Sequence, residues 1–292
     1  MMPQYEYIHL TAKGACNLLP KRDAFSHKGS FGTLIAVSGS VFYTGAALLC
    51  CSAAAKCGVG ITCLASVKEA CAVVGANCPE VTYLPFVAHE CGTLPESAAE
   101  SIIKRAEKAT AMLIGCGIGN TEQTSGLVRR ILADRKLPTV VDADGLNVIA
   151  DSPELLRGCV ITPHIGEMAR LCGCDTDSIK ADPAAAALRF AKEYDCVVVL
   201  KDADTIVAAP DGRVFLNIGR NSALAKGGSG DVLAGMTASF LAQGMKPFDC
   251  AMAAVTLHSE AGKRIAQKYS KRGALPHELI DEVRAIFAEN GL

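Results

Sequence analysis

The stretch TLIAVSGS at residues 33–40, followed by GAALLCCSAAAKCG at residues 45–58, decides the fold class. The first stretch is apolar without alternation and ends in a small turn containing glycine, which predicts a buried strand. The second is rich in alanine and leucine and is stopped by Gly58, which predicts a helix from about Gly45. A strand, a glycine turn and a helix in this order indicate the first part of a βαβ unit.

The same pattern continues along the chain. Further strands are predicted at ITCLAS (61–66), VTYLPF (81–86), AMLIGCG (111–117), TVVDADG (139–145), CVITPH (159–164) and CVVVLKD (196–202). Because these runs are continuously apolar, we predict an α/β fold with a single doubly wound, mostly parallel sheet and helices on both faces. The PDG turn in TIVAAPDGRVFLN (205–217) predicts an appended hairpin. The stretch ALPHELIDEVRAIFAEN (274–290) predicts an amphipathic helix.

Composition narrows the function classes. No linker or low-complexity segment divides the 292 residues, so we expect one domain over 1–292. The net charge is -1 without a basic cluster, which argues against nucleic acid as a partner. The N-terminus lacks a signal pattern, and the longest apolar run is too short to span a membrane, so we expect a cytoplasmic protein without a membrane partner. The 14 cysteines form no pair of CxxC motifs, so we expect no zinc site and a reducing compartment.

Polar or glycine-rich clusters follow several predicted strands. They are SGS (38–40), GCGIGN (115–120), DADGLN (142–147), TPHIGE (162–167) and LKDADT (200–205). Ligands of parallel sheets bind beyond the carboxyl ends of the strands, so these clusters predict one shared active-site rim. The carboxylates of Asp142 and Glu167 are candidate Mg²⁺ ligands, through water and substrate phosphate. Helix capping and turn formation are the alternative roles for both residues.

The run GGSGDVLAG (227–235) is the strongest single motif. Gly227, Gly228 and Gly230 let backbone N–H groups approach a ligand closely, and the apolar spacing after Asp231 predicts a helix beginning here. A helix N-terminus favours an anion such as phosphate. A carboxylate there would repel the phosphate unless it had a use, and taking a proton from a nucleophilic hydroxyl is such a use. A plain tight turn with a first-turn acid is the weaker alternative.

Taken together, the ordered motifs resemble those of the ADP/ATP-dependent NAD(P)H-hydrate dehydratases, a branch of the ribokinase-like superfamily. The motifs are KGSFGTLIAVSGSVFYTGAALL, GCGIGN, VVDADGLNVIA, ITPHIGEMARL, LKDADTIVAAPDG and GGSGDVLAG, over about 28–262. The resemblance implies a metabolite-repair hydro-lyase. Such an enzyme phosphorylates the ring hydroxyl of the S epimer of hydrated NADH or NADPH and then eliminates phosphate. It implies Mg²⁺ as cofactor, a homotetramer, and ADP as the more likely donor over ATP, because the PHxGE form is similar to the bacterial type.

The resemblance also implies roles for individual residues. Asp231 would activate the ring hydroxyl, and Gly230 would stabilise the transferred phosphoryl group. The hydrate pocket would be lined by Ala46, Gly117, Gly119, His164 and Asp231. The adenine nucleotide would be held by Lys201, Asp202, Ala203, Asp204, Thr205, Gly228, Ser229 and Gly230. The family's N-terminal epimerase domain is not expected in this chain, so a separate epimerase is the expected functional partner.

Two departures from the family pattern lie on the nucleotide side. Asp202 stands where the family usually has glycine, and GRNSALAKGG (219–228) stands where it tends to read TGNPGMATGG. On the other side, Cys116 replaces the proline of the commoner GPG. The alternatives are a hydroxyethylthiazole or hydroxymethylpyrimidine kinase of the same superfamily, and a non-catalytic nucleotide-binding protein. A Rossmann dehydrogenase using GCGIGN is a third, although this run lacks the full GxGxxG spacing.

Overall fold

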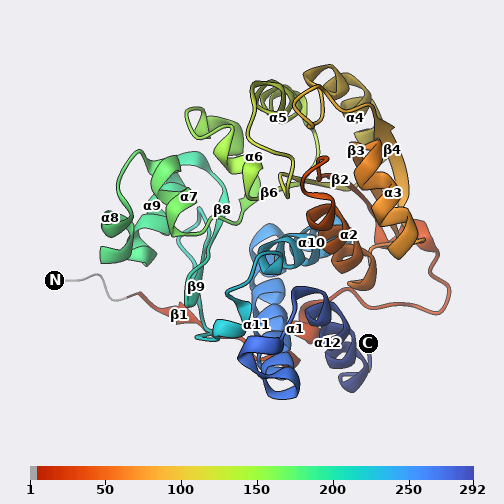
Figure 1. Cartoon of the computed structure of the whole chain (residues 1–292). Coiled ribbons are helices and arrows are strands. Elements are labelled where there is room, and N and C mark those ends of the chain that lie inside the picture. Colours follow the sequence, from red (N-terminus) through yellow and green to blue (C-terminus); the bar gives the residue numbers. More distant parts are fainter. Residues whose placement is uncertain (1–4) are drawn as a thin grey trace.

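A computed structural model describes residues 5–292, which form an α/β fold around one ten-stranded sheet (Figure 1). The strand order is β1-β10-β9-β8-β7-β6-β5-β2-β3-β4, and β9 alone runs antiparallel to its neighbours. The strands are β1 (Tyr7–Ile8), β2 (Thr33–Val37), β3 (Ile61–Val67), β4 (Thr82–Phe86), β5 (Ala111–Ile114), β6 (Thr139–Val141), β7 (Cys159–Ile161), β8 (Val197–Leu200), β9 (Asp204–Ala208) and β10 (Val214–Ile218). The predicted mostly parallel sheet and the hairpin after β8 are confirmed.

Helices cover both faces of the sheet, as predicted (Figure 1). One face carries α2 (Thr44–Lys56), α3 (Lys68–Asn77), α10 (Ser229–Ala242), α11 (Pro247–Gly273) and α12 (Pro276–Glu289). The other carries α4 (Ala99–Ala106), α5 (Glu122–Asp134), α6 (Asp144–Asn147), α7 (Ile165–Cys172), α8 (Thr176–Ala181) and α9 (Pro183–Tyr194). Every residue of β5, β6, β7 and β8 is buried, because helices shield these strands on both sides.

Helix α10 is buried along almost its whole length between the sheet and helices α2 and α11. Its closest approach to α2 is at Gly235, where a Cβ atom would lie 2.2 Å from the carbonyl oxygen of Cys50. Only glycine fits there, since real Cβ atoms do not approach an oxygen so closely. The two helix backbones are therefore in direct contact next to the GGSGD loop.

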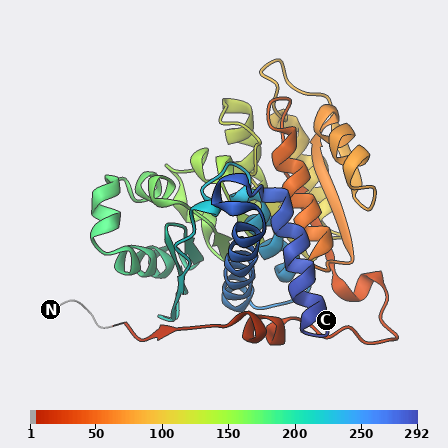
Figure 2. The same ribbon diagram turned by 60° about the horizontal axis from the view of Figure 1, so that its bottom comes forward.

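The N-terminal segment, which the sequence analysis left without structure, lies along one end of the molecule (Figure 2). In it, β1 adds a parallel edge strand to β10, and α1 (Ala12–Leu18) packs on α11. Thr11 caps α1, because its side chain accepts a hydrogen bond from the Gly14 N–H at 3.1 Å. The short strand and helix are too brief to give a periodic pattern in the sequence.

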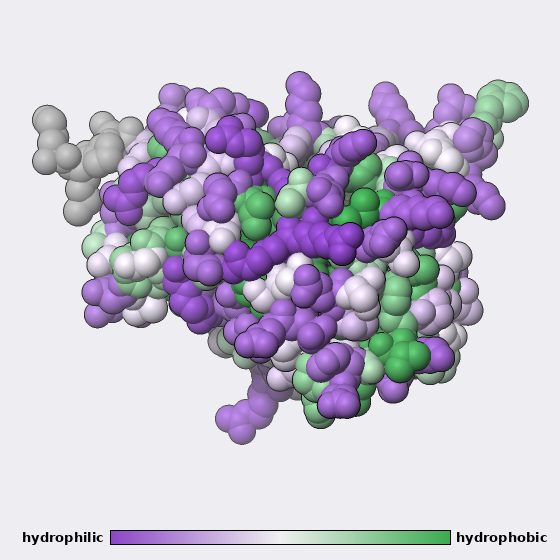
Figure 3. Space-filling view, turned by 90° about the horizontal axis from the view of Figure 1, so that it is seen from above, coloured by the Kyte–Doolittle hydropathy of each residue, from purple (hydrophilic) through white to green (hydrophobic). Residues whose placement is uncertain are grey.

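The surface is mostly polar in the view from above. Figure 3 shows hydrophilic side chains over much of that face, with apolar side chains in small separate groups. Within residues 5–292, no helix is both long enough and apolar enough to cross a lipid bilayer.

Candidate active site

The polar clusters that end β2, β5, β6 and β7 meet at one edge of the sheet. The Cys116 carbonyl oxygen accepts hydrogen bonds from the Ser38 hydroxyl at 2.7 Å and the Gly39 N–H at 2.8 Å. The strand-end segments after β7 and β8 pair through an isolated bridge between His164 and Lys201. These contacts join the clusters because parallel strands direct their carboxyl ends the same way. The clusters therefore share one rim, as predicted, and its role as the active site stays a prediction.

Asp142 forms the buried centre of this rim. Its side chain is only 2% exposed, and its Oδ1 accepts hydrogen bonds from the Thr162 hydroxyl at 2.6 Å and the Lys201 ammonium at 2.8 Å. Burial acts to lower the pKa of Lys201, but the negative charges of Asp142 and Glu167 outweigh it and the pKa is raised. Lys201 is therefore a cation at neutral pH, held at the base of the site.

Asp231 lies in the first turn of α10, beside this ion pair. Carboxylate oxygens of Asp231 and Asp142 and the Cys116 sulfur all lie within 4.8 Å of one another. Burial, and then the neighbouring Cys50 and Asp142, raise the pKa of Asp231 to about 7, although Cys116 and Lys201 oppose the shift. A carboxyl group with a pKa near neutral is suited to accept a proton during a reaction.

The glycine loop before Asp231 approaches the ion pair at Gly230. Gly228 is the N-cap of α10 with a φ of 103°, a conformation that favours glycine. A Cβ at Gly230 would lie 3.4 Å from the Lys201 Nζ and 3.9 Å from the Asp142 Oδ2, so this residue faces the centre. The Ser229 hydroxyl is buried without a hydrogen-bond partner among residues 5–292. The Ser229 N–H donates to the Lys226 carbonyl oxygen at 3.2 Å, and the helix N-terminus as a whole favours an anion.

His258, from α11, supports this loop from behind. Its Nε2 lies 3.0 Å from the Ser229 carbonyl oxygen, and a carbonyl only accepts hydrogen bonds, so Nε2 carries the proton. Burial lowers the pKa of His258 to about 4, and the ring is therefore neutral at physiological pH. No feature of the sequence singled out His258, because it lies in the buried, mostly apolar first half of a long helix.

Of the residues predicted for the hydrate pocket, Ala46, Gly117 and Gly119 form one adjacent group, and His164 lies elsewhere on the rim, in the bridge to Lys201. A Cβ at Gly117 would lie 2.7 Å from the Ala46 Cβ, so these two residues touch. Gly119 lies in the same turn, and its N–H donates to the Asp144 Oδ2 at 2.9 Å. His164 lies at the start of α7, and its side chain is 54% exposed.

His164 and Glu167 form a capping box at the N-terminus of α7. The His164 Nδ1 accepts from the Gly166 N–H at 3.0 Å, and the Glu167 Oε2 accepts from the His164 N–H at 2.8 Å. The capping role that the sequence left open for Glu167 is therefore present. Asp142, the other predicted metal ligand, lies in the cluster with Cys116 and Asp231 instead.

The segment 201–205 divides between the centre and a separate pocket of about 390 Å³. Lys201 turns toward Asp142, whereas Asp202, Ala203 and Asp204 line the pocket. Arg220 lines it too, and its Nη2 donates to the Asp204 Oδ2 at 2.8 Å. Asp202 and Arg220, one residue from each of the two departures from the family pattern, thus line the same pocket. Thr205 lies in β9 opposite Asn217 of β10.

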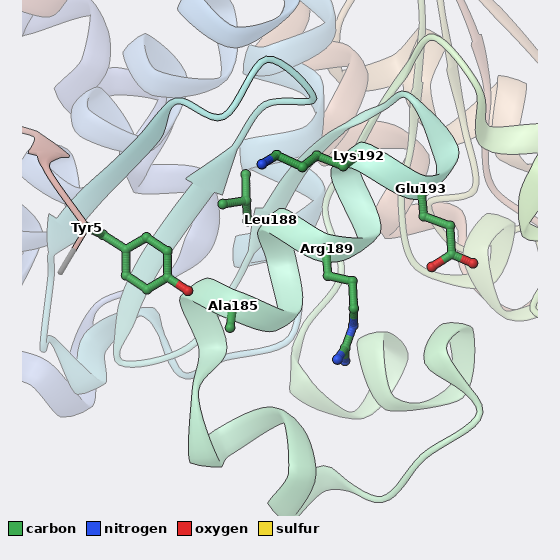
Figure 4. Close-up of a pocket in the computed structure, with 6 residues that line it drawn as sticks. All are labelled: Tyr5, Ala185, Leu188, Arg189, Lys192 and Glu193. Carbon is green, nitrogen blue, oxygen red and sulfur yellow. The ribbon is translucent and has the colours of Figure 1, made fainter. Parts of the chain in front are cut away.

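A second hollow, of about 520 Å³, lies on the surface of α9 (Figure 4). Tyr5 and the α9 residues Arg189, Lys192 and Glu193 line it, and the three charged side chains point in different directions. None of its lining residues comes from the strand-end clusters. The hollow is therefore separate from the rim.

Thr162, Ser38 and Cys50 complete the centre and were not among the predicted site residues. Thr162 and Ser38 lie in the quoted motifs TPHIGE and SGS, so their place at strand ends was a usable signal. No such signal existed for Cys50, because a single cysteine in an alanine-rich helix is expected to be a small apolar residue. Its Sγ contacts the Ser38 hydroxyl oxygen at 3.3 Å.

A family model described as NAD(P)H-hydrate dehydratase matches residues 34–285. The chain belongs to the NAD(P)H-hydrate dehydratase family. The resemblance stated from the motifs is therefore confirmed, and so is the ribokinase-like fold. A ribokinase-like superfamily protein from Enterococcus faecalis, 24% identical, superimposes with a TM-score of 0.86 over 99% of both chains.

Relatives within the NAD(P)H-hydrate dehydratase family are of two lengths. A bifunctional NAD(P)H-hydrate repair enzyme of Moorella thermoacetica is 36% identical over 93% of this chain, but only 52% of the relative is covered. The chain spans about half the length of several curated relatives. An ADP-dependent (S)-NAD(P)H-hydrate dehydratase of Neisseria meningitidis is 38% identical over 83% of this chain and 80% of its own.

A solved family structure matches the whole chain. The ADP/ATP-dependent NAD(P)H-hydrate dehydratase of Bacillus subtilis, co-crystallised with ATP and Mg²⁺, superimposes with a TM-score of 0.82 at 28% identity. The match covers 98% of this chain and 100% of that one. The departures at Asp202 and Arg220 therefore occur within an intact family fold.

Proposed function

We propose that the protein restores NADH and NADPH from the S epimers of their hydrates, in a dehydration driven by an adenine nucleotide. The observation that carries this proposal is Asp231, a partly buried carboxyl group with a pKa of about 7 at the mouth of a glycine loop. The glycines of GGSGD are suited to a phosphate-binding loop of the kinase type. Asp231 is suited to act as the base that accepts the proton of a hydroxyl. The family membership and the names of the relatives support the same reaction.

In the proposed reaction, Asp231 takes the proton of the ring hydroxyl. The hydroxyl oxygen bonds at the same time to the terminal phosphorus of the nucleotide. The bond between that phosphorus and the rest of the nucleotide breaks, so AMP is the leaving group when ADP is the donor. Lys201 and the N–H groups near Gly230 stabilise the negative charge on the transferred group. The ring C–O bond then breaks, phosphate departs, and loss of a ring proton restores the dihydronicotinamide.

The two substrates would occupy opposite sides of Asp231. Ala46, Gly117, Gly119 and His164 line the proposed hydrate side. The nucleotide would contact residues 201–205 together with Gly228, Ser229 and Gly230. The buried, unpartnered Ser229 hydroxyl supports a phosphate at the loop, because a buried donor without a partner is costly unless a ligand satisfies it.

Mg²⁺ fits the donor set only in part. The Asp142 Oδ1 is occupied by Thr162 and Lys201, which leaves Oδ2 for a cation, and Glu167 is held by its capping bonds. We therefore propose Asp142 as the protein's main contact, through water, and Glu167 as a lesser one. When bound, the ion would neutralise charge on the nucleotide phosphates.

Incubation of the protein with hydrated NADH, Mg²⁺ and either ADP or ATP tests the proposal. We expect recovery of the dihydronicotinamide absorbance, faster with ADP, with AMP and phosphate as products. A stable phosphorylated product would instead favour a kinase. Hydroxyethylthiazole kinase from Pyrococcus horikoshii has a TM-score of 0.56 at 15% identity, which supports only a shared fold. Nucleotide binding without any turnover would favour a non-catalytic protein.

The homotetramer, the cytoplasmic location and the separate epimerase partner stay predictions. Analytical ultracentrifugation tests the first, since a tetramer of 30.4 kDa chains is easily separated from a monomer. Addition of an epimerase to the assay tests the last: we expect the fraction of hydrate recovered to rise when both epimers are supplied.

A further inference from the structure

We propose that Cys116, Asp142 and Asp231 form a binding site for a thiophilic divalent cation such as Zn²⁺ or Cd²⁺. One ligand atom of each residue lies within 4.8 Å of the other two. The three residues come from separate places in the chain: Cys116 follows β5, Asp142 follows β6, and Asp231 opens α10. The sequence shows no metal motif for this reason.

The geometry is close to what a tetrahedral cation needs. The Cys116 Sγ lies 3.8 Å from the Asp142 Oδ2. Sulfur and oxygen ligands of tetrahedral zinc are separated by about 3.6 Å, from bond lengths of about 2.3 Å and 2.1 Å. Lys201 and Thr162 both bind the other oxygen of Asp142, so they hold this carboxylate while leaving Oδ2 directed at the thiol. Small side-chain rotations would bring the three ligands to bonding distance.

The charge and the surroundings also favour a cation. Two carboxyl groups lie together where Asp142 is almost fully buried, and Lys201 is the cation bound to it. Cys116 adds a sulfur donor to the two carboxyl groups. Sulfur donors select zinc-like ions over Mg²⁺, which prefers oxygen. The site therefore shares the Asp142 Oδ2 with the proposed magnesium contact but selects a different ion.

Binding would convert the Cys116 thiol to a metal-bound thiolate and release its proton to solvent. Affinity is therefore expected to increase with pH. The ion would also occupy the Asp231 carboxylate and so block its use as a base. This inhibition rests on the proposed function, whereas the binding itself does not.

Cadmium is the probe, because its bond to a thiolate produces a charge-transfer absorption in the ultraviolet. For this test the parent protein is the full-length chain with the substitutions Cys91→Ser, Cys172→Ser and Cys174→Ser. These substitutions remove the thiols outside the buried interior. We expect this parent to bind one Cd²⁺ per chain, measured by titration calorimetry and by the new absorption. Absence of any such band in the parent would overturn the proposal.

Three variants in that parent assign the ligands. Cys116→Ser should abolish the absorption and weaken binding by at least about tenfold. Asp231→Asn, which preserves shape, should weaken binding similarly while leaving the absorption of any bound ion in place. Cys250→Ser removes another fully buried thiol and should change neither quantity. Equal cadmium binding by the Cys116→Ser and parent proteins would overturn the site. If the Cys116→Ser variant does not fold, equal binding by the Asp231→Asn and parent proteins would overturn it instead. Cadmium binding by the parent, together with no dehydratase activity in cadmium-free protein assayed with Mg²⁺, would contradict the proposed function alone.

Discussion

Two ion pairs lie at the carboxyl-end rim of the sheet and differ in their access to solvent. In the inner pair, the side chains of Lys201 and Asp142 are 21% and 2% exposed, and in the outer pair those of Arg220 and Asp204 are 75% and 26% exposed. Water and salt screen the outer pair, so it adds little to stability. The inner pair holds a buried charge that has lost its water and depends on its partner. We therefore expect the rim to be rigid around Asp142 and more adjustable around Asp204.

The largest effect is expected from replacing Asp231, the acid that lies beside the inner pair. Asp231→Asn keeps the size of the side chain but cannot accept the proton, so kcat should fall by about 10²- to 10⁴-fold. Steady-state assays on hydrated NADH measure this, and calorimetry should find nucleotide binding retained. Substantial turnover by the variant would show that another group is the base.

Breaking the inner pair should cost stability. Lys201→Met leaves Asp142 as a buried charge without a partner, so the free energy of unfolding should fall by about 3–5 kcal/mol. Thermal denaturation should show a Tm lower by roughly 6–20 °C, at about 2–4 °C per kcal/mol. The double variant Lys201→Met/Asp142→Asn should regain part of this loss. A double variant as unstable as the single one would contradict the electrostatic cause.

The raised pKa of Asp231 predicts opposite effects of pH on activity and on stability. Activity should decrease as pH falls through about 7, because the carboxyl group must be ionised to act as a base. Stability should fall as pH rises from about 4 to 7, since in that window the folded protein keeps a proton that the unfolded chain, with a pKa near 3.9, has lost. Denaturant titrations over this range measure it. Asp231→Asn should lack this contribution. If the difference in unfolding free energy between the two proteins stayed constant from about pH 4 to 7, the raised pKa of Asp231 would be contradicted.

The smallest effect is expected at the outer pair. Arg220→Ala should leave the Tm and kcat nearly unchanged, because the guanidinium is exposed to solvent. The KM for the nucleotide should change by no more than a few-fold. The matched change Asp202→Gly, which restores the family residue, tests the same pocket without removing a charge pair. A collapse of kcat in either variant would mean that the nucleotide side is as tightly constrained as the inner pair.

The fold followed from the sequence because buried parallel strands and glycine turns leave a local signature. The runs at β2, β5, β6 and β8 were visible as unbroken apolar segments, and their polar ends marked the rim. The partners of Asp142 were harder to predict, since Lys201 and Thr162 are 59 and 20 residues away from it. His258 had no local signal at all, because its role depends on packing against the Ser229 carbonyl oxygen.

The contact at Gly235 has a consequence for how this enzyme family can vary. Because α10 and α2 touch there through backbone atoms, the position of Asp231 along α10 is tied to that of Cys50 on α2. A larger residue at 235 would move one helix outward, and the helix N-terminus would carry Asp231 with it. A substitution at this position would therefore displace the proposed proton acceptor, even though residue 235 lies about one turn of helix away from Asp231.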